Sequence, residues 1–155
     1  MEKIDPLTQV AEFHKTFNAP ILDQPQIPSE ERCELRVSLL QEELNELKEA
    51  IADRDLVEIA DALCDLQYVL SGAVLEFGLG DKFPALFDEV QRSNMSKACN
   101  NQKEADETIA FYKEKGEDAF SQPSGDKINV HRTSDHKVLK NKYYSPADLK
   151  SILEN

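Results

Sequence analysis

The sequence has few of the residues that build glycine-rich loops and catalytic turns. Its 155 residues include only five glycines. Neither a glycine-rich phosphate-binding loop nor a G-x-S-x-G turn occurs in it. These absences exclude the P-loop nucleotide-binding proteins and the hydrolases that place a serine nucleophile on a sharp turn.

Cysteine is also scarce, and its spacing excludes two common kinds of site. Cys33, Cys64 and Cys99 are far apart in the chain, and no C-x-x-C pair occurs. The histidines are equally scattered, so the sequence predicts neither a disulfide framework nor a zinc site. Reduced thiols are typical of cytoplasmic proteins, and we expect this location.

Basic residues are outnumbered, with 18 lysines and arginines against 30 acids and a formal net charge of −12. A surface of this sign repels phosphate backbones, and no basic patch offsets it, so we expect no nucleic-acid partner. An acidic surface instead suits a protein that collects divalent cations.

Long uncharged apolar runs are missing as well. The most apolar stretch, residues 56–79, carries Glu58, Asp61, Asp65 and Glu76. Because charges at the centre of a membrane span are costly, we expect no membrane partner. The first ten residues contain no apolar signal core.

What the sequence does contain is a series of helix signals. Asp5 and Pro6 predict a helix start, and Ser29 predicts a second start after a proline-rich connection. The second helix carries an apolar stripe, which we expect to be buried, of Val37, Leu40, Leu44, Leu47 and Ile51. Further helices are expected over residues 56–77, from 81 or 82 onward, and over 103–115.

The C-terminal part is expected to differ. Residues 116–127 are expected to form a loop, residues 128–132 and 137–144 a small hairpin, and Ser145 to cap a last helix. The prediction is a single, mainly α domain over residues 1–155, with residues 126–155 as a hairpin-and-helix appendage. The second and third helices are expected to form half of a four-helix bundle, and their remaining apolar surface indicates a homodimer or a dimer of dimers.

Two pairs of acids mark the second and third helices. Glu43 and Glu46 are three residues apart, as are Glu58 and Asp61, so each pair lies on one side of its helix. Helical rotation places both pairs toward the partner helix, whereas Glu42 and Glu49 fall at the solvent margin.

Four carboxylates that converge between two helices would repel one another strongly. A hard divalent cation removes this repulsion, and ligands that are all oxygen favour Mg²⁺ or Mn²⁺. A run of glutamates alone is usually a solvated helix face, so a non-catalytic acidic helical module that binds a partner is the rival reading.

The pattern E-E-x-x-E followed by E-x-x-D resembles the signature of the MazG-like, all-α nucleoside triphosphate pyrophosphohydrolases, which include dimeric dUTPase-related enzymes and phosphoribosyl-ATP pyrophosphohydrolase. Residues 61–73, 92–97 and 135–140 are similar to a phage and bacterial subgroup of that family. The resemblance covers roughly residues 10–149.

The resemblance implies a metal-dependent hydrolysis of a nucleoside triphosphate to the monophosphate and pyrophosphate. It implies that Glu43, Glu46, Glu58 and Asp61 bind Mg²⁺ or Mn²⁺. By the same resemblance, Glu42 orients or deprotonates the attacking water, or holds an extra ion, and Glu43 also belongs to the catalytic group. A deoxynucleotide is the expected substrate, and phosphoribosyl-ATP is the alternative.

A triphosphate also needs positive and polar donors. The resemblance implies phosphate or sugar contacts from Arg92, Ser93, Asn94 and Lys97, whereas a plain polar helix end is the alternative interpretation. Asp65 follows Asp61 by one turn and is a candidate sugar contact or supporting ligand. Tyr68 is a candidate for base contact, although a tyrosine on an amphipathic helix usually belongs to the core.

Overall fold

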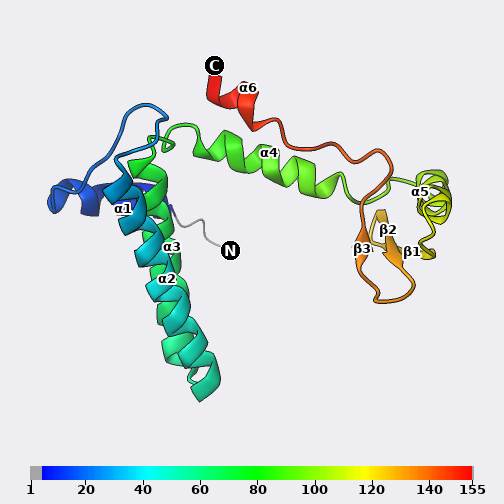
Figure 1. Ribbon diagram of the computed structural model, residues 1–155, viewed down its shortest axis with the longest axis horizontal. Helices are drawn as coiled ribbons and strands as arrows, with labels where there is room; N and C mark the ends of the chain where they lie inside the picture. Colours follow the sequence, from blue (N-terminus) through cyan, green and yellow to red (C-terminus); the bar gives the residue numbers. More distant parts are fainter. Residues whose placement is uncertain (1–4, 155) are drawn as a thin grey trace. The chain divides into compact units, whose positions relative to one another are not determined.

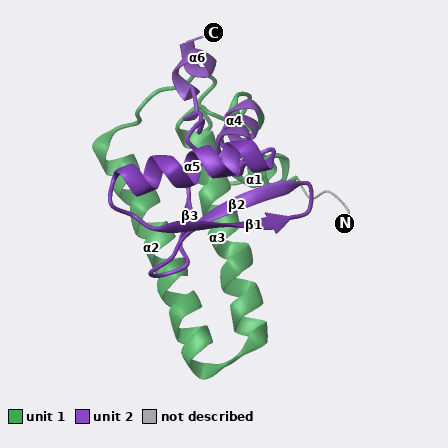
Figure 2. Cartoon of the chain, turned by 90° about the vertical axis from the view of Figure 1, so that its right-hand side faces the viewer, with its two compact units in different colours: residues 1–84 green, residues 85–155 purple. Residues whose placement is uncertain are grey.

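The computed structural model describes residues 5–154, which form two compact units divided between residues 84 and 85 (Figure 1, Figure 2). The predicted, mainly helical fold with a small C-terminal sheet and a terminal helix is confirmed. The single-domain assignment stays a prediction. In chain order the elements are α1 (Pro6–Thr16), α2 (Glu30–Asp53), α3 (Leu56–Glu76), α4 (Phe83–Met95), α5 (Gln102–Glu114), β1 (Ala119–Ser124), β2 (Lys127–Arg132), β3 (Val138–Leu139) and α6 (Leu149–Glu154).

The first unit is built on α2 and α3, which lie side by side in opposite directions (Figure 1). A two-residue turn joins them. Arg54 adopts a left-handed conformation with φ of 56°, and the Asp55 carboxylate accepts hydrogen bonds from the backbone N–H groups of Val57 (2.9 Å) and Glu58 (3.2 Å). This capping satisfies the free donors at the start of α3. The tight turn fixes which residues of α2 lie opposite the first turns of α3.

α1 covers part of α3 and begins as the sequence predicts. The Asp5 carboxylate accepts a hydrogen bond from the Thr8 backbone N–H at 3.1 Å, and Pro6 occupies the first turn. Val10 is buried, but Phe13 and Phe17 are 42% and 65% exposed. The spacing of Val10, Phe13 and Phe17 along the first helix predicts that all three are buried, and this prediction is wrong for the two aromatic residues.

The apolar stripe of α2 is the largest departure from expectation. Val37 and Ile51 are 68% and 56% exposed, and the two buried residues of α2 are Arg36 and Ala50. Arg36, Glu43 and Ala50 are spaced by seven residues, which places them on one side of the helix. This side also carries Leu40 and Leu47 of the stripe, which are half-buried, whereas Val37, Leu44 and Ile51 stay exposed. Small and charged residues of both helices meet on it.

A buried ion cluster joins α2 to the C-terminal end of α3. Glu76 is only 1% exposed and accepts hydrogen bonds from Arg32 and Arg36. Burial opposes its ionisation, but the two arginines outweigh that effect and lower the pKa of Glu76. Gly72 makes room for this cluster, since a Cβ atom there would lie 2.7 Å from Nη1 of Arg36 and 3.0 Å from Nε2 of His14.

The second unit packs α5 against a three-stranded antiparallel sheet of order β1-β2-β3 (Figure 2). Its core contains Cys99, Ala105, Val130 and Leu139. The loop expected over residues 116–127 is wrong in part, because residues 119–124 form β1 and pair with β2. β3 is shorter than expected, since it spans only residues 138–139.

The last helix also starts later than predicted. The backbone N–H of Ser145 donates to Ser96 Oγ at 3.0 Å, and α6 begins only at Leu149. The Asp148 carboxylate accepts a hydrogen bond from the Ser151 backbone N–H at 3.2 Å. Asp148 therefore takes the role expected of Ser145, because hydrogen bonds with the side chains of Arg92 in α4 and of Ser96 just after it hold Ser145 and Pro146 outside the helix. In the described part of the chain, every helix is too short or too polar to cross a membrane.

Candidate functional site

Acidic side chains from α2 and α3 line a pocket of about 350 Å³ near the turn between the helices. Ala50 and Ala62 are 7% and 3% exposed, and these small side chains let the two helices approach closely. The residues that line the pocket are Glu46, Glu49, Ala50, Asp53, Asp55, Glu58, Asp61 and Ala62. We call this the acidic pocket. It combines six carboxylates with no lysine or arginine.

Three of the four predicted metal ligands, Glu46, Glu58 and Asp61, lie in the acidic pocket. Their convergence follows from the turn at Arg54 and Asp55. Because this turn has only two residues, the last turns of α2 lie opposite the first turns of α3. The side chains of all three remain exposed, so the pocket is open to a ligand from solvent.

Glu43, the fourth predicted ligand, lies one turn before Glu46 and is half-buried. Burial raises the pKa of the Glu43 carboxyl, and the negative charges of Glu46, Asp65, Glu42 and Asp61 raise it further. Acids of both helices thus act on Glu43, which places its side chain on the α3 side of α2. This electrostatic strain is the kind that a divalent cation relieves.

Oxygen donors of this kind suit a hard cation such as Mg²⁺ or Mn²⁺. Within residues 5–154, however, no three side chains of histidine, cysteine, aspartate or glutamate are close enough together to hold a metal ion. The residues therefore fit a divalent cation by their chemistry and charge, and they would have to draw together around it.

Sequence reasoning missed three members of the acidic pocket, Glu49, Asp53 and Asp55. Glu49 is exposed, as the prediction of a place at the solvent margin requires, and it also lines the pocket beside Glu46 and Asp53. Glu49 and Asp53 follow Glu46 by three and seven residues, a spacing that keeps them on the same side of α2. This spacing could have identified them. Asp55 enters because it caps α3.

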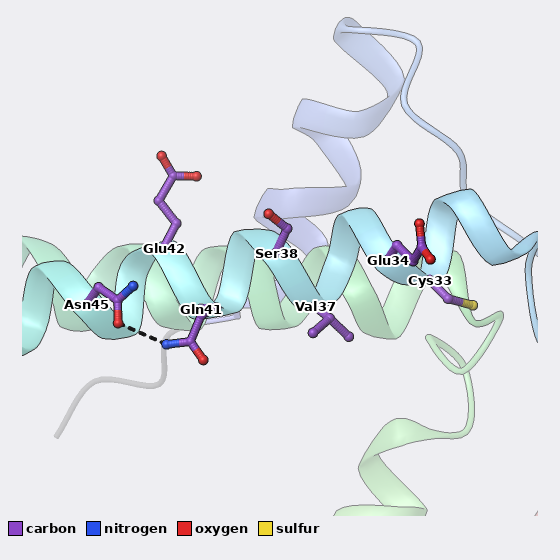
Figure 3. A pocket seen from close by; sticks show the side chains of 7 residues that line it. All are labelled: Cys33, Glu34, Val37, Ser38, Gln41, Glu42 and Asn45. Atoms are coloured by element: carbon purple, nitrogen blue, oxygen red, sulfur yellow. Dashed lines mark hydrogen bonds between the residues drawn. The ribbon is translucent and has the colours of Figure 1, made fainter.

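Glu42 lies on another part of α2. It lines an open hollow together with residues of α2 alone, namely Cys33, Glu34, Val37, Ser38, Gln41 and Asn45. Figure 3 shows its carboxylate pointing away from the hydrogen bond between Gln41 and Asn45, which measures 2.9 Å. A catalytic role for Glu42 stays a prediction, since Glu42 lines a different hollow from Glu46, Glu58 and Asp61.

Asp65 and Tyr68 continue α3 beyond the acidic pocket. Asp65 is half-buried, and its charge contributes to the raised pKa of Glu43. Tyr68 meets the ring of Phe13 edge-on, with 5.6 Å between ring centroids, and lines a separate pocket with residues of α1. Tyr68 is thus packed against α1 on one side while 39% of it stays exposed.

The predicted phosphate contacts Arg92, Ser93, Asn94 and Lys97 belong to the second unit. Arg92 forms a two-pronged ion pair with Glu89, at 2.7 and 2.8 Å, and donates a third hydrogen bond to the Pro146 carbonyl. This pairing holds the pKa of Glu89 at about 2. Arg92 therefore supports the C-terminal segment.

The other three residues of this group are engaged in two separate hydrogen bonds. Ser93 is 4% exposed, and its Oγ donates to the Tyr144 hydroxyl at 3.2 Å. The Lys97 ammonium donates to the Asn94 side-chain oxygen at 2.7 Å, which confirms that these two side chains are neighbours. Direct contacts of these residues with a substrate stay predictions.

Comparison with models of protein families identifies a family for this chain. The model of the family described as phosphoribosyl-ATP pyrophosphohydrolase matches residues 10–94, a segment that contains most of α1, all of α2 and α3, and most of α4. All the residues of the acidic pocket lie within it. No curated protein matches the chain.

Proposed function

The chain belongs to the phosphoribosyl-ATP pyrophosphohydrolase family, part of the MazG-like all-α superfamily, and we propose that it hydrolyses a deoxynucleoside triphosphate to the monophosphate and pyrophosphate. The family indicates a pyrophosphohydrolase and depends on divalent metals in general. The observation that carries the proposal is the acidic pocket, in which six carboxylates meet with no cationic side chain.

The acids of the pocket would hold a metal ion and would make substrate binding depend on it. Glu46, Glu58 and Asp61 would hold a divalent cation, Mg²⁺ or Mn²⁺, with Glu43 beside them. Such a cation supplies positive charge for the polyphosphate and lowers the pKa of a water molecule. The carboxylates themselves repel the phosphate groups, which makes binding of the substrate dependent on positive charge.

Product analysis in ¹⁸O-labelled water tests the proposal. Attack of water on the α-phosphorus leaves the label in the nucleoside monophosphate. Label in pyrophosphate would mean attack on the β-phosphorus, and label in orthophosphate would mean a phosphatase. If no nucleotide is hydrolysed with Mg²⁺ or Mn²⁺, the chain is a non-catalytic acidic module.

Substitutions in the acidic pocket provide a second test of the proposed function. Glu46→Gln and Asp61→Asn should abolish turnover, because each removes a charge that would hold the cation. Glu34→Gln is a matched control on α2, since Glu34 is exposed and lies outside the acidic pocket. It should change turnover less than a few fold. Equal losses in all three variants would contradict the assignment.

Phosphoribosyl-ATP is the second candidate substrate, and the description of the matching family favours it. The same acids would serve both substrates, because both reactions cleave a phosphoanhydride next to a nucleoside monophosphate. Comparing kcat/KM for phosphoribosyl-ATP with the values for a panel of deoxynucleotides and ribonucleotides separates them.

We also propose that the chain works as a homodimer or a dimer of dimers. Support comes from the apolar stripe of α2, where Val37, Leu44 and Ile51 remain 68%, 39% and 56% exposed. A single chain leaves this surface in water, where it favours association. Light scattering of the purified protein measures the number of chains.

A further inference from the structure

The chain between β3 and α6 runs alongside α4, in the opposite direction to the helix (Figure 1). We call residues 144–148 of this connection the strap. From the hydrogen bonds that hold it on α4, we infer that the strap is autoinhibitory and must leave α4 before Arg92 and Ser93 can contact the phosphate groups of a substrate. The inference rests on the proposed function and on the phosphate contacts predicted for these two residues.

The strap binds to a single side of α4 and of the turn that follows it. The four residues that contact the strap are spaced by three or four positions, which places them in one row along the helix; they are Glu89, Arg92, Ser93 and Ser96. The Ser93 hydroxyl donates to the Tyr144 hydroxyl at 3.2 Å. The Ser96 hydroxyl accepts from the Ser145 backbone N–H at 3.0 Å and donates to the Ser145 carbonyl at 3.3 Å.

The rest of the strap is held by the ion pair of α4. Arg92 donates to the Pro146 carbonyl at 3.0 Å, and the Asp148 backbone N–H donates to the Glu89 carboxylate at 2.8 Å. The strap is therefore attached along its whole length, mainly through its backbone groups.

This attachment closes off two of the residues predicted to bind phosphate. Ser93 is only 4% exposed, and the Tyr144 hydroxyl takes the hydrogen bond that the serine can donate. Nε and Nη2 of Arg92 are occupied by Glu89 and by the Pro146 carbonyl. A phosphate oxygen that approached Ser93 would have to take the place of Tyr144.

The strap is built so that it can detach at a low cost in free energy. Within the described part of the C-terminal segment, none of residues 142–154 is buried. Asn141, by contrast, is 5% exposed, its backbone N–H donates to the Lys97 carbonyl at 2.9 Å, and its side-chain amide donates to the Ala98 carbonyl at 3.1 Å. Segments that bury little apolar surface open more readily than the core. Asn141 thus marks the hinge beyond which the chain can leave α4.

Detachment of the strap limits the affinity for the substrate. When only the open fraction of the molecules binds a ligand, the apparent Kd equals the intrinsic Kd divided by that fraction. The loss of one neutral hydrogen bond shifts such an opening equilibrium about five-fold. Weakening the strap should therefore tighten substrate binding by about the same factor.

Two substitutions weaken the strap without touching a residue predicted to bind the substrate or the metal. Ser96→Ala removes both side-chain hydrogen bonds to Ser145, and Tyr144→Phe removes the contact with the Ser93 hydroxyl but keeps the ring that Lys140 contacts. Each should lower KM for the nucleotide about five-fold and change kcat less than two-fold. Ser134→Ala is the matched control, because Ser134 is an exposed serine of the second unit that lies outside the strap. Its KM should equal that of the wild type.

Hydrogen exchange of the wild type measures the strap without any turnover. The backbone N–H groups of Ser145 and Asp148 both donate to residues of the α4 row, so their exchange reports detachment. Saturating inorganic triphosphate with Mg²⁺ should speed the exchange of both amides at least five-fold. Unchanged or slower exchange in the presence of triphosphate overturns the inference. So does a failure of triphosphate to bind at millimolar concentration, or a KM that is unchanged or raised in both strap variants.

These results are separable from those of the proposed function. If triphosphate speeds exchange of the strap but no nucleotide is hydrolysed, the proposed function fails and the strap inference stands. If nucleotides are hydrolysed while the strap stays equally protected with and without triphosphate, the strap is only structural and the proposed function stands.

Discussion

Replacing Glu76 by glutamine should destabilise the first unit by about 3 kcal/mol. Breaking a buried ion pair by removing one partner generally costs about 3–5 kcal/mol, because the other charge stays buried without compensation. The side chain of Arg36 is only 9% exposed, whereas that of Arg32 is 33% exposed and can regain water. One fully buried charge, not two, is left behind, so the lower end of the range applies.

Thermal unfolding followed by circular dichroism at 222 nm measures this effect. For a chain of this length, 1 kcal/mol shifts Tm by about 2–4 °C, so Glu76→Gln should lower Tm by about 6–12 °C. Glu34→Gln, an exposed change on α2, should shift the free energy of unfolding by less than about 0.5 kcal/mol. Exchanging Arg36 for methionine in the Glu76→Gln background should recover part of the loss, because the orphaned charge is gone.

A loss below about 1 kcal/mol for Glu76→Gln would refute the reasoning. It would mean that Arg36 reaches water once its partner is removed. Failure of the Arg36 exchange to recover any stability would show that Glu76 acts through packing and not through charge.

Three further predictions concern the acidic pocket. Because the pKa of Glu43 is raised in the folded state, ionisation of its carboxyl disfavours folding, so without metal Glu43→Gln should be more stable than the wild type at pH 7. The difference in stability should vanish below pH 4.5, the ordinary pKa of the carboxyl. Denaturation at both pH values in EDTA checks this, and an equal difference at both would contradict it. Titration with Mn²⁺ or Mg²⁺ should raise the stability of the wild type by roughly 2.7 kcal/mol at one hundred times Kd, and calorimetry that detects no binding would refute a metal site. Glu49→Gln should weaken that binding measurably, since Glu49 lines the pocket; unchanged affinity would mean that Glu49 takes no part in holding the cation.

Local sequence signals were sufficient for the helices and for most of the acids. Asp5, Pro6 and Asp55 act within one turn of the chain, so their capping roles can be read without any tertiary contact. The pairing of Glu58 with Asp61 on one side of α3 likewise follows from the helical period alone. The strand over residues 119–124 escaped prediction because its order comes from pairing with β2, which is not local.

The sequence by itself determined that the chain is mainly helical and that its acids gather where α2 meets α3. Only the tertiary structure decided which side of α2 faces α3. The apolar stripe predicts burial by hydrophobicity, yet Val37 and Ile51 stay exposed, because the salt bridge of Arg36 with Glu76 and the close approach at Ala50 and Ala62 turn the adjacent side of α2 toward α3. Hydrophobic periodicity indicates how much free energy a helix face gains when it is buried, but it does not show which other element is there to cover that face.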